Sequence, residues 1–235
     1  MKILIVIPMK EEFEYFLKSC NSLGYKTEDC TVGKLSAKVI PELNVTLARG
    51  GFGKVKFAVK TQHLLDAYTR WDLVICAGTA GALIDDVSAG DVVVATATVE
   101  HDFCNTSGKA SLPKFEGKDT VISSLRHVSL PAGTAFKLHF GIIASGDEVV
   151  LEKRRRSSLH KLTGALVVDL EGAGGARACR FSDVPFVEIR GATDNADQYT
   201  LEDFETNLEI AMDNVAKLIT SWINPREHKE KDLSI

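Results

Sequence analysis

Three acidic residues of this 235-residue chain, Glu12, Glu171 and Asp194, each follow a short apolar run. The three runs are 3–7, 166–169 and 185–189. Taken singly, each acid fits a helix cap or a surface charge. Burying a carboxylate at the end of a strand costs free energy unless the group is paired with a cation, caps a helix, or takes part in binding or catalysis. Three of them in one chain therefore favour a pocket, and carboxyl groups gathered in a pocket are suited to general acid–base catalysis.

Alternating strands and helices are the elements that must position these acids. Short apolar runs alternate with amphipathic stretches, which is the pattern of strands covered by helices. We expect strands at 3–7, 44–48, 73–76, 91–99, 138–144, 166–169 and 185–191. We expect helices at 11–19, 54–68, 149–162, 172–181 and 201–223. The sequence thus predicts a single α/β domain over residues 1–224, built on a central twisted mixed sheet flanked by helices. A charged tail at 225–235, expected to be mobile, follows it.

Residues 101–135 lose this periodicity and gain Gly, Pro, Ser and Lys. A loop of that length in a compact domain is usually functional or part of an interface. We therefore expect a long excursion from the core in this region.

Three glycine-rich segments follow predicted strands, where open α/β sheets place their ligand sites. The first, GGFGKV at 50–55, is not a phosphate loop, because Val55 stands where a Walker motif needs Ser or Thr. It also lacks the third glycine of a dinucleotide fingerprint, and its glycines suit close approach to a small ligand. The second, GTAG at 78–81 with GDV at 90–92, fits two tight turns around a surface loop as well as it fits a ligand site. The third, at 170–175, places Glu171 where a strand becomes a helix.

Composition excludes several function classes. The net charge of -4 offers no basic patch for nucleic acid or an anionic membrane, and the KRRR run at 153–156 is predicted to be a solvated helix face. The apolar run at 3–7 ends at Pro8 without a cleavage site, which favours a buried strand over a signal peptide. No segment reaches the roughly 18 apolar residues that span a bilayer. Five scattered cysteines without a CxxC pair favour reduced thiols in the cytoplasm over disulfides or a zinc site.

The acids and glycine segments belong to a larger set of motifs. In them the sequence resembles the nucleoside phosphorylase and nucleosidase superfamily, and within it the 5′-methylthioadenosine/S-adenosylhomocysteine nucleosidases. Six motifs carry the resemblance in order: PMKEE at 8–12, GFGKV at 51–55, GTAG at 78–81 with GDV at 90–92, SGD at 145–147, DLEGA at 169–173 and VEIRGATD at 187–194. Each motif is weak alone, whereas the ordered set, covering residues 1 to about 223, is specific. The resemblance implies a nucleoside phosphorylase-like fold, a homodimer, and neither metal nor cofactor.

The resemblance gives each acid a role. Asp194 matches the acid that protonates N7 of adenine, and burial would help it to keep its proton. Glu171 matches the residue that binds the ribose hydroxyls and stabilises the cation-like sugar, and Glu12 matches the residue that activates water. The implied reaction is hydrolysis of the N-glycosidic bond of an adenine nucleoside, such as 5′-methylthioadenosine or S-adenosylhomocysteine, to adenine and the free sugar. The resemblance also implies a place in methionine salvage.

Further substrate-binding residues are implied in the same way. Thr79 matches a hydroxyl-bearing residue near the sugar and the water, and Val149 and Val150 match the segment whose backbone reads the adenine edge. Phe52, in the GFGKV motif, and Phe204, as an aromatic wall for the base, complete the expected pocket.

Two departures from the family concern the substrate. Leu170 stands where the family usually has Met; because Leu can pack under a ribose, we expect altered affinity rather than lost activity. The loop at 102–118 differs from the loop that helps relatives to build the dimer and the pocket for the 5′-substituent. The identity of that substituent is therefore left open.

Three alternatives are weighed against an adenine nucleosidase. A phosphorylase needs cationic donors for phosphate, typically an Arg just before the Gly-Ser/Thr turn. Here residues 75–77 are Ile, Cys and Ala, and the remaining candidates are Arg49 and Arg190, of which Arg190 is as readily structural. A futalosine-type hydrolase of 6-oxopurines would carry Asn in place of Asp194. A non-catalytic nucleoside binder would have no need of Glu12.

Overall fold

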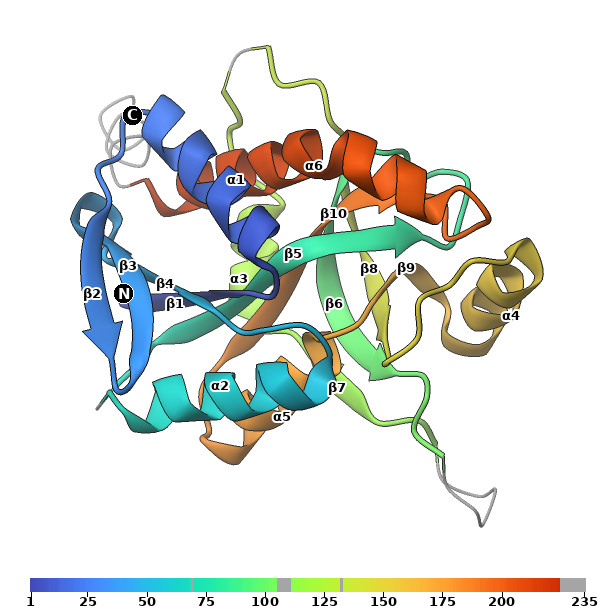
Figure 1. Ribbon diagram of the computed structural model, residues 1–235, viewed down its shortest axis with the longest axis horizontal. Helices are drawn as coiled ribbons and strands as arrows, with labels where there is room; N and C mark the ends of the chain where they lie inside the picture. The colour runs from blue at the N-terminus through green and yellow to red at the C-terminus, as the bar shows by residue number, and fades with distance from the viewer. Residues whose placement is uncertain (69, 105–110, 132, 225–235) are drawn as a thin grey trace.

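The structure, a computed structural model, describes residues 1–68, 70–104, 111–131 and 133–224 (Figure 1). Its elements in chain order are β1 (Ile3–Ile7), α1 (Lys10–Ser22), β2 (Glu28–Val32), β3 (Leu35–Ile40), the 3₁₀ turn η1 (Pro41–Leu43), β4 (Val45–Arg49), α2 (Lys54–Asp66), β5 (Leu73–Ala82), β6 (Val92–Glu100), β7 (Lys114–Glu116), α3 (Asp119–Leu125), β8 (Leu138–Ser145), α4 (Lys153–Thr163), β9 (Ala165–Asp169), α5 (Gly172–Phe181), β10 (Phe186–Asp194) and α6 (Thr200–Ile223). The expected tail at 225–235 lies outside the described residues.

All of these strands join one mixed sheet, in the order β10-β6-β8-β9-β5-β1-β4-β3-β2, with β7 paired to β6. An additional pairing of β10 with β5 closes β5, β10, β6, β8 and β9 into a ring. The predicted α/β fold with a central mixed sheet is confirmed, and the closure of part of that sheet is a feature that strand prediction alone does not contain.

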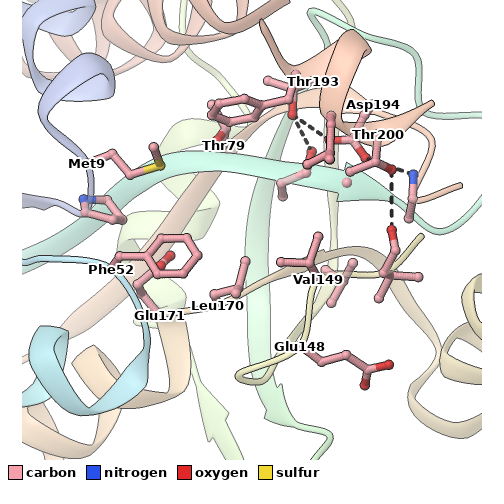
Figure 2. Close-up of a pocket in the computed structure, with 18 of the residues that line it drawn as sticks. Met9, Phe52, Thr79, Glu148, Val149, Leu170, Glu171, Thr193, Asp194 and Thr200 are labelled. Atoms are coloured by element: carbon pink, nitrogen blue, oxygen red, sulfur yellow. Dashed lines mark hydrogen bonds between the residues drawn. The ribbon is translucent and has the colours of Figure 1, made fainter. Parts of the chain in front are cut away.

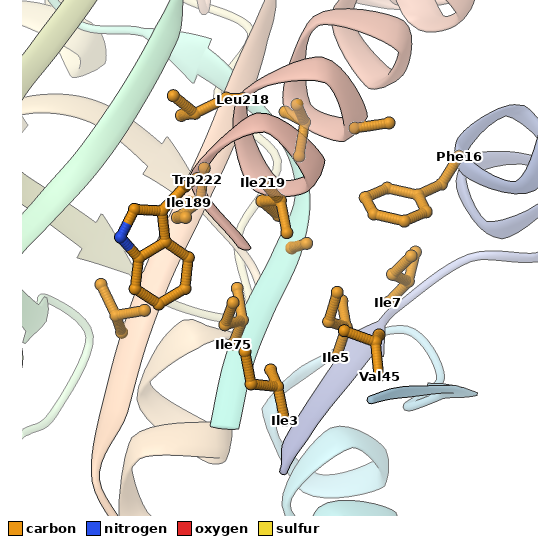
Figure 3. Packing of buried hydrophobic residues seen from close by; sticks show 14 of the residues in the cluster. Ile3, Ile5, Ile7, Phe16, Val45, Ile75, Ile189, Leu218, Ile219 and Trp222 are labelled. Carbon is orange, nitrogen blue, oxygen red and sulfur yellow. The ribbon is translucent and has the colours of Figure 1, made fainter. Parts of the chain in front are cut away.

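Helices cover both faces of the sheet, α1 and α6 on one side and α2 and α5 on the other (Figure 1). Strand β1 is buried along its whole length because its alternate side chains enter two cores. Ile3, Ile5 and Ile7 pack with the α1 and α6 side chains, including Phe16 (Figure 3). Leu4 and Val6 join the core under α2 and α5. A continuous apolar run of five residues is thus the expected signature of a strand covered on both sides.

The segment GTAG at 78–81 is not a turn. It lies inside β5, which continues to Ala82 and pairs with β10 through Arg190↔Gly78, Gly191↔Thr79 and Ala192↔Ala80. The prediction of a strand ending at residue 76 was therefore wrong, because small residues that resemble a turn are used here to bring two strands and their polar side chains together.

The other differences concern boundaries and short elements. The hairpin of β2 and β3 was not predicted, and the excursion at 101–135 contains β7 and α3, whereas 105–110 and 132 lie outside the described residues. The helix predicted at 149–162 begins only at Lys153. Its basic run is solvated in part: Arg155 pairs with Glu148, and Arg156 pairs with Asp85. In the part of the chain that the structure describes, no helix is long and apolar enough to cross a membrane.

Candidate active site

One cavity, with a volume of about 200 Å³, brings together all nine residues singled out from the sequence. They are Glu12, Phe52, Thr79, Val149, Val150, Leu170, Glu171, Asp194 and Phe204. Asp194 lies with Thr193 and Thr200 on one side of the cavity, and Glu171 lies with Phe52 and Leu170 on the other (Figure 2). The cavity therefore has two polar sides separated by apolar surface.

Glu12 is held in the first turn of α1, where it is only 2 % exposed. The backbone N–H of Met9 donates to Glu12 Oε2 at 2.9 Å. The backbone N–H and the hydroxyl of Thr79 both donate to Glu12 Oε1, at 2.8 and 2.7 Å. Three donors aimed at two oxygens suit an ionised carboxylate, which can only accept hydrogen bonds. The arrangement fits a proton acceptor.

Glu171 lies between β9 and α5 and is 4 % exposed. The backbone N–H of Gly53, in the glycine-rich loop before α2, donates to its Oε1 at 3.0 Å. Burial raises the pKa of Glu171 to about 8, with smaller contributions from Asp169 and Glu12 in the same direction, while Arg190 opposes them. A carboxyl group whose pKa is raised by burial thus faces the cavity beside the glycine loop.

Asp194 is the last residue of β10 and is 6 % exposed. The backbone N–H of Ala196 and the hydroxyl of Thr200 donate to its Oδ1 at 2.9 and 3.0 Å, and the Thr193 hydroxyl donates to Oδ2 at 2.8 Å. Burial raises the pKa of Asp194 even though these three hydrogen bonds favour the charged form. The physical cause is desolvation, which disfavours a charge in an apolar surrounding.

Both glycines of the GTAG segment make room for side chains of the site. A Cβ added to Gly78 would lie 2.4 Å from Arg190 Nη1 and 3.1 Å from Glu12 Oε1. A Cβ added to Gly81 would lie 2.8 Å from Asp194 Oδ1. Real Cβ atoms do not approach polar atoms to 2.4–2.8 Å, so β5 needs glycine at position 78, against Arg190, and at position 81, against Asp194.

The remaining walls are apolar and lead to an open mouth. Phe52, Val149 and Leu201 are 52, 45 and 66 % exposed, and all three line the cavity. Val150 is buried, and its carbonyl accepts a hydrogen bond from the Thr200 hydroxyl at 3.3 Å. An apolar slot with a few convergent polar groups is the usual form of a small-molecule site.

Sequence reasoning missed several residues of this region. Met9, Glu148, Thr193, Thr200 and Leu201 line the cavity. Their signal was available in part, because Met9 and Thr193 lie inside the motifs at 8–12 and 187–194, and Glu148 directly follows the motif at 145–147. Thr200, six residues after Asp194, reaches it only through the turn before α6, so its role depends on tertiary structure.

Arg190 lies behind the cavity and is fully buried. Burial opposes its charge, but the surrounding acids, Asp169 foremost, raise its pKa well above the ordinary value. It pairs with Asp169 and Glu188, so the interpretation of Arg190 as a structural cation has support in its contacts. Arg49, the other cation considered, does not line the cavity.

No Lys or Arg is found among the described residues that line the cavity. Nor do the described residues contain a group of three His, Cys, Asp or Glu side chains placed as metal ligands would be. The expectation of a site without metal or cofactor stays a prediction.

Known proteins are similar to this chain over most of its length. The family model described as the phosphorylase superfamily matches residues 2–224. The 5′-methylthioadenosine/S-adenosylhomocysteine nucleosidase of Thermotoga maritima is 32 % identical over 171 residues, covering 73 % of this chain and 75 % of the relative.

Two solved structures are similar over nearly the whole chain. Futalosine hydrolase of Helicobacter pylori has a TM-score of 0.83 at 27 % identity, covering 95 % of this chain and 97 % of that one. The 5′-methylthioadenosine/S-adenosylhomocysteine nucleosidase of S. pneumoniae, with the transition-state inhibitor MT-ImmA, has a TM-score of 0.83 at 26 % identity, covering 95 and 99 %. With a family match over residues 2–224, the chain belongs to the phosphorylase superfamily.

Proposed function

We propose that this N-glycosyl hydrolase cleaves 5′-substituted adenine nucleosides, such as 5′-methylthioadenosine or S-adenosylhomocysteine, with water as the nucleophile. Asp194 protonates N7 of the leaving adenine, Glu12 activates the water, and Glu171 binds the ribose hydroxyls. The observation that carries the proposal is the distribution of three buried carboxyl groups around one apolar cavity, with Asp194 on the side opposite Glu171 (Figure 2). The base and the sugar of one bound nucleoside would then each lie next to a carboxyl group.

The surroundings of Asp194 support its role as the acid. Its pKa is raised by burial, which favours the protonated form that must deliver a proton. Both threonine hydroxyls that donate to it have a second acceptor: Thr200 has the Val150 carbonyl at 3.3 Å, and Thr193 has the Ala80 carbonyl at 3.4 Å. Asp194 can therefore be protonated without leaving either hydroxyl unpartnered.

Water is favoured over phosphate by the charge of the walls. A phosphate dianion needs cationic donors, whereas the described lining residues include Glu12, Glu148, Glu171 and Asp194 and no Lys or Arg. Arg190 has its Nε and Nη2 engaged by Glu188 and Asp169. Among the described lining residues, a phosphate dianion would therefore find no free cation to balance its charge.

A futalosine-type hydrolase is the second candidate, because the Helicobacter pylori futalosine hydrolase is as similar in fold as the nucleosidases. The acid at position 194 favours adenine, since an amide could bind the edge of a 6-oxopurine but could not protonate N7. The exposed apolar mouth formed by Phe52, Val149 and Leu201 suits an apolar 5′-substituent.

The proposal is tested by incubating the protein in phosphate-free buffer with a panel of 5′-substituted adenosines, inosine and futalosine. We expect adenine to be released from 5′-methylthioadenosine, with no dependence on added phosphate. A strict phosphate requirement would identify a phosphorylase, and release of base from futalosine alone would identify the second candidate. Binding without turnover of any substrate would identify a nucleoside-binding protein.

Three further properties are proposed together with the activity: a homodimer, a place in methionine salvage and a cytoplasmic location. Exposed apolar side chains on α2 support the dimer, since Val55 and Val59 lie one turn apart on this helix and are 72 and 65 % exposed. Sedimentation equilibrium of the purified protein, with Val59→Lys as a disrupting variant, tests the dimer.

A further inference from the structure

A second group of buried charges lies behind the three acids, on the strand that ends in Asp194. Glu188 and Arg190 are two residues apart on β10, so both side chains leave the same face of the strand, and neither is exposed. Arg190 Nε donates to Glu188 Oε1 at 2.8 Å, and the Thr98 hydroxyl, from the neighbouring strand β6, donates to Glu188 Oε2. A fully buried carboxyl group is thus held at both oxygens, and the function proposed above does not use it.

The first turn of α5 makes room for this carboxyl group. A Cβ added to Gly172 would lie 2.2 Å from Glu188 Oε2 and 2.3 Å from Oε1. Any other residue at position 172 would displace the Glu188 side chain. Because Gly172 directly follows Glu171, the Glu188 carboxyl group packs against the backbone that carries the acid on the sugar side of the cavity.

Arg190 connects Glu188 to Glu171. Its Nε donates to Glu188 and its Nη2 donates to Asp169, so one edge of the guanidinium is fixed by two carboxyl groups. The opposite corner, Nη1, has only longer contacts: Glu171 Oε2 and the Thr79 carbonyl both lie at 3.5 Å. The guanidinium is rigid and planar, so the carboxyl groups that hold one edge also determine where Nη1 points.

This cluster contains more acids than bases. The titratable and charged groups around Glu188 and its guanidinium partner come from five elements or their ends: Arg190 on β10, Asp169 at the end of β9, Glu171 before α5, Glu12 on α1 and Cys76 on β5. Burial raises the pKa of Glu188 to about 8 and that of Glu171 to about 8. The two acids compete for one guanidinium, and Glu188 has the closer contact, at 2.8 Å against 3.5 Å.

We propose that Glu188 is a positioning residue for the sugar side of the active site. It holds the Nε edge of Arg190 and, through that guanidinium, sets the direction of Nη1 and the charge of Glu171. The inference rests on the proposed function for the role of Glu171, whereas the contacts that carry it are independent of the substrate.

Two variants separate the hydrogen bond from the charge. Glu188→Gln keeps an oxygen acceptor for Arg190 Nε but removes the negative charge. Glu188→Met has a similar length and leaves Nε without its acceptor. Glu100→Gln is the matched control: Glu100 is also a buried carboxyl group on the sheet, but it pairs with Lys54 and Arg177 and does not contact Arg190.

Two readouts are compared in wild type and variants: kcat and KM for 5′-methylthioadenosine as functions of pH, and the titration of Glu171. The titration is followed by NMR of protein with ¹³C-labelled glutamate carboxyl groups, in which the Glu171 signal is identified by its loss in Glu171→Gln. In Glu188→Gln we expect the Glu171 midpoint to fall by about one pH unit, because Arg190 then acts on one fewer anion, while kcat stays within about tenfold. In Glu188→Met we expect kcat to fall at least about 100-fold with a smaller change in KM, the pattern of a lost transition-state interaction.

Three results would overturn the inference. One is a Glu171 midpoint that does not move in Glu188→Gln. Another is equal loss of kcat in the Gln and Met variants with an unchanged pH profile, which would mark a purely structural residue. The third is the same midpoint shift in Glu100→Gln. If the wild type hydrolyses no adenine nucleoside, the proposed function fails, yet the Glu171 titration in Glu188→Gln still decides whether Glu188 acts through Arg190.

Discussion

Replacing Asp194 by Asn tests the proton-transfer step most directly. Asn keeps an oxygen that can accept from the Ala196 N–H and the Thr200 hydroxyl, as Asp194 Oδ1 does at 2.9 and 3.0 Å. Its amide N–H₂ then takes the place of Oδ2 and faces the Thr193 hydroxyl, which can turn to the Ala80 carbonyl at 3.4 Å. Every buried polar group is therefore still satisfied, and we expect the fold and nucleoside binding to persist.

Catalysis, in contrast, should be largely lost, because Asn cannot donate a proton to the leaving base. Positioned proton transfer contributes about 10²–10⁴-fold to rates, and a factor of about 10³ corresponds to about 4 kcal/mol of transition-state stabilisation. We expect kcat for 5′-methylthioadenosine to fall by about that factor in Asp194→Asn, with KM changed only a few-fold. Adenine release is measured by chromatography, and substrate binding by calorimetry.

The pH dependence of stability provides an independent readout for the same variant. The folded-state pKa of Asp194 is raised above its unfolded value, so its contribution is fully present below the unfolded pKa and is lost as the pH rises through the folded pKa. The Asn variant does not titrate. The Tm of the Asn variant, relative to the Tm of the wild type, should therefore rise as the pH increases from acid to neutral. A kcat within tenfold of the wild type would refute the role of Asp194, and a Tm difference independent of pH would refute its buried, protonated state.

Three further predictions follow from the site. Glu12→Gln should lower kcat by at least about 100-fold with little change in KM, because the amide cannot accept the proton of water; steady-state kinetics measures both. The pKa of Glu171, raised from 4.5 to about 8 by burial, means that wild-type stability is lost progressively between about pH 4.5 and 8. Gln does not titrate, so the Tm of Glu171→Gln should fall less than the Tm of the wild type as the pH rises across this range. An equal dependence of Tm on pH in the two proteins would contradict the raised pKa of Glu171. Leu170→Met, a swap of similar volume, should change KM by only a few-fold and leave kcat unchanged, whereas a large fall in kcat would show that Leu170 is required in place of Met.

Many elements were predictable because local patterns determine them. The run at 3–7 is continuously apolar because β1 is buried on both faces. The acids that follow β1 and β9, and the acid that ends β10, lie at strand ends, where ligand sites form. The motif resemblance then selected nine residues that line one cavity. Their chemical roles remain predictions that the variants above test.

Other features depend on partners that are distant in the chain. The GTAG segment looks like a turn locally, and only its pairing with β10 reveals that glycine is required where Arg190 and Asp194 lie against β5. The closure of β10 onto β5 is likewise a tertiary pairing. Burial, which raises the pKa of Asp194 and Glu171, is a property of the assembled core and cannot be read from residue type.

Glu188 illustrates which features can be predicted from the sequence and which depend on the tertiary structure. The alternation in FVEIRG places Glu188 and Arg190 on one face of a strand, so their proximity was available from sequence periodicity. That both are fully buried, and that Gly172 leaves space for the Glu188 carboxyl group, follows only from the packing of α5 and β6 against β10. The sequence by itself determined which charged groups this protein has and the order of its main strands and helices, but not the short elements β2, β3, β7 and α3. The tertiary structure decided which of those groups share a dry site, because desolvation and charge pairing act between residues brought together from five separate elements.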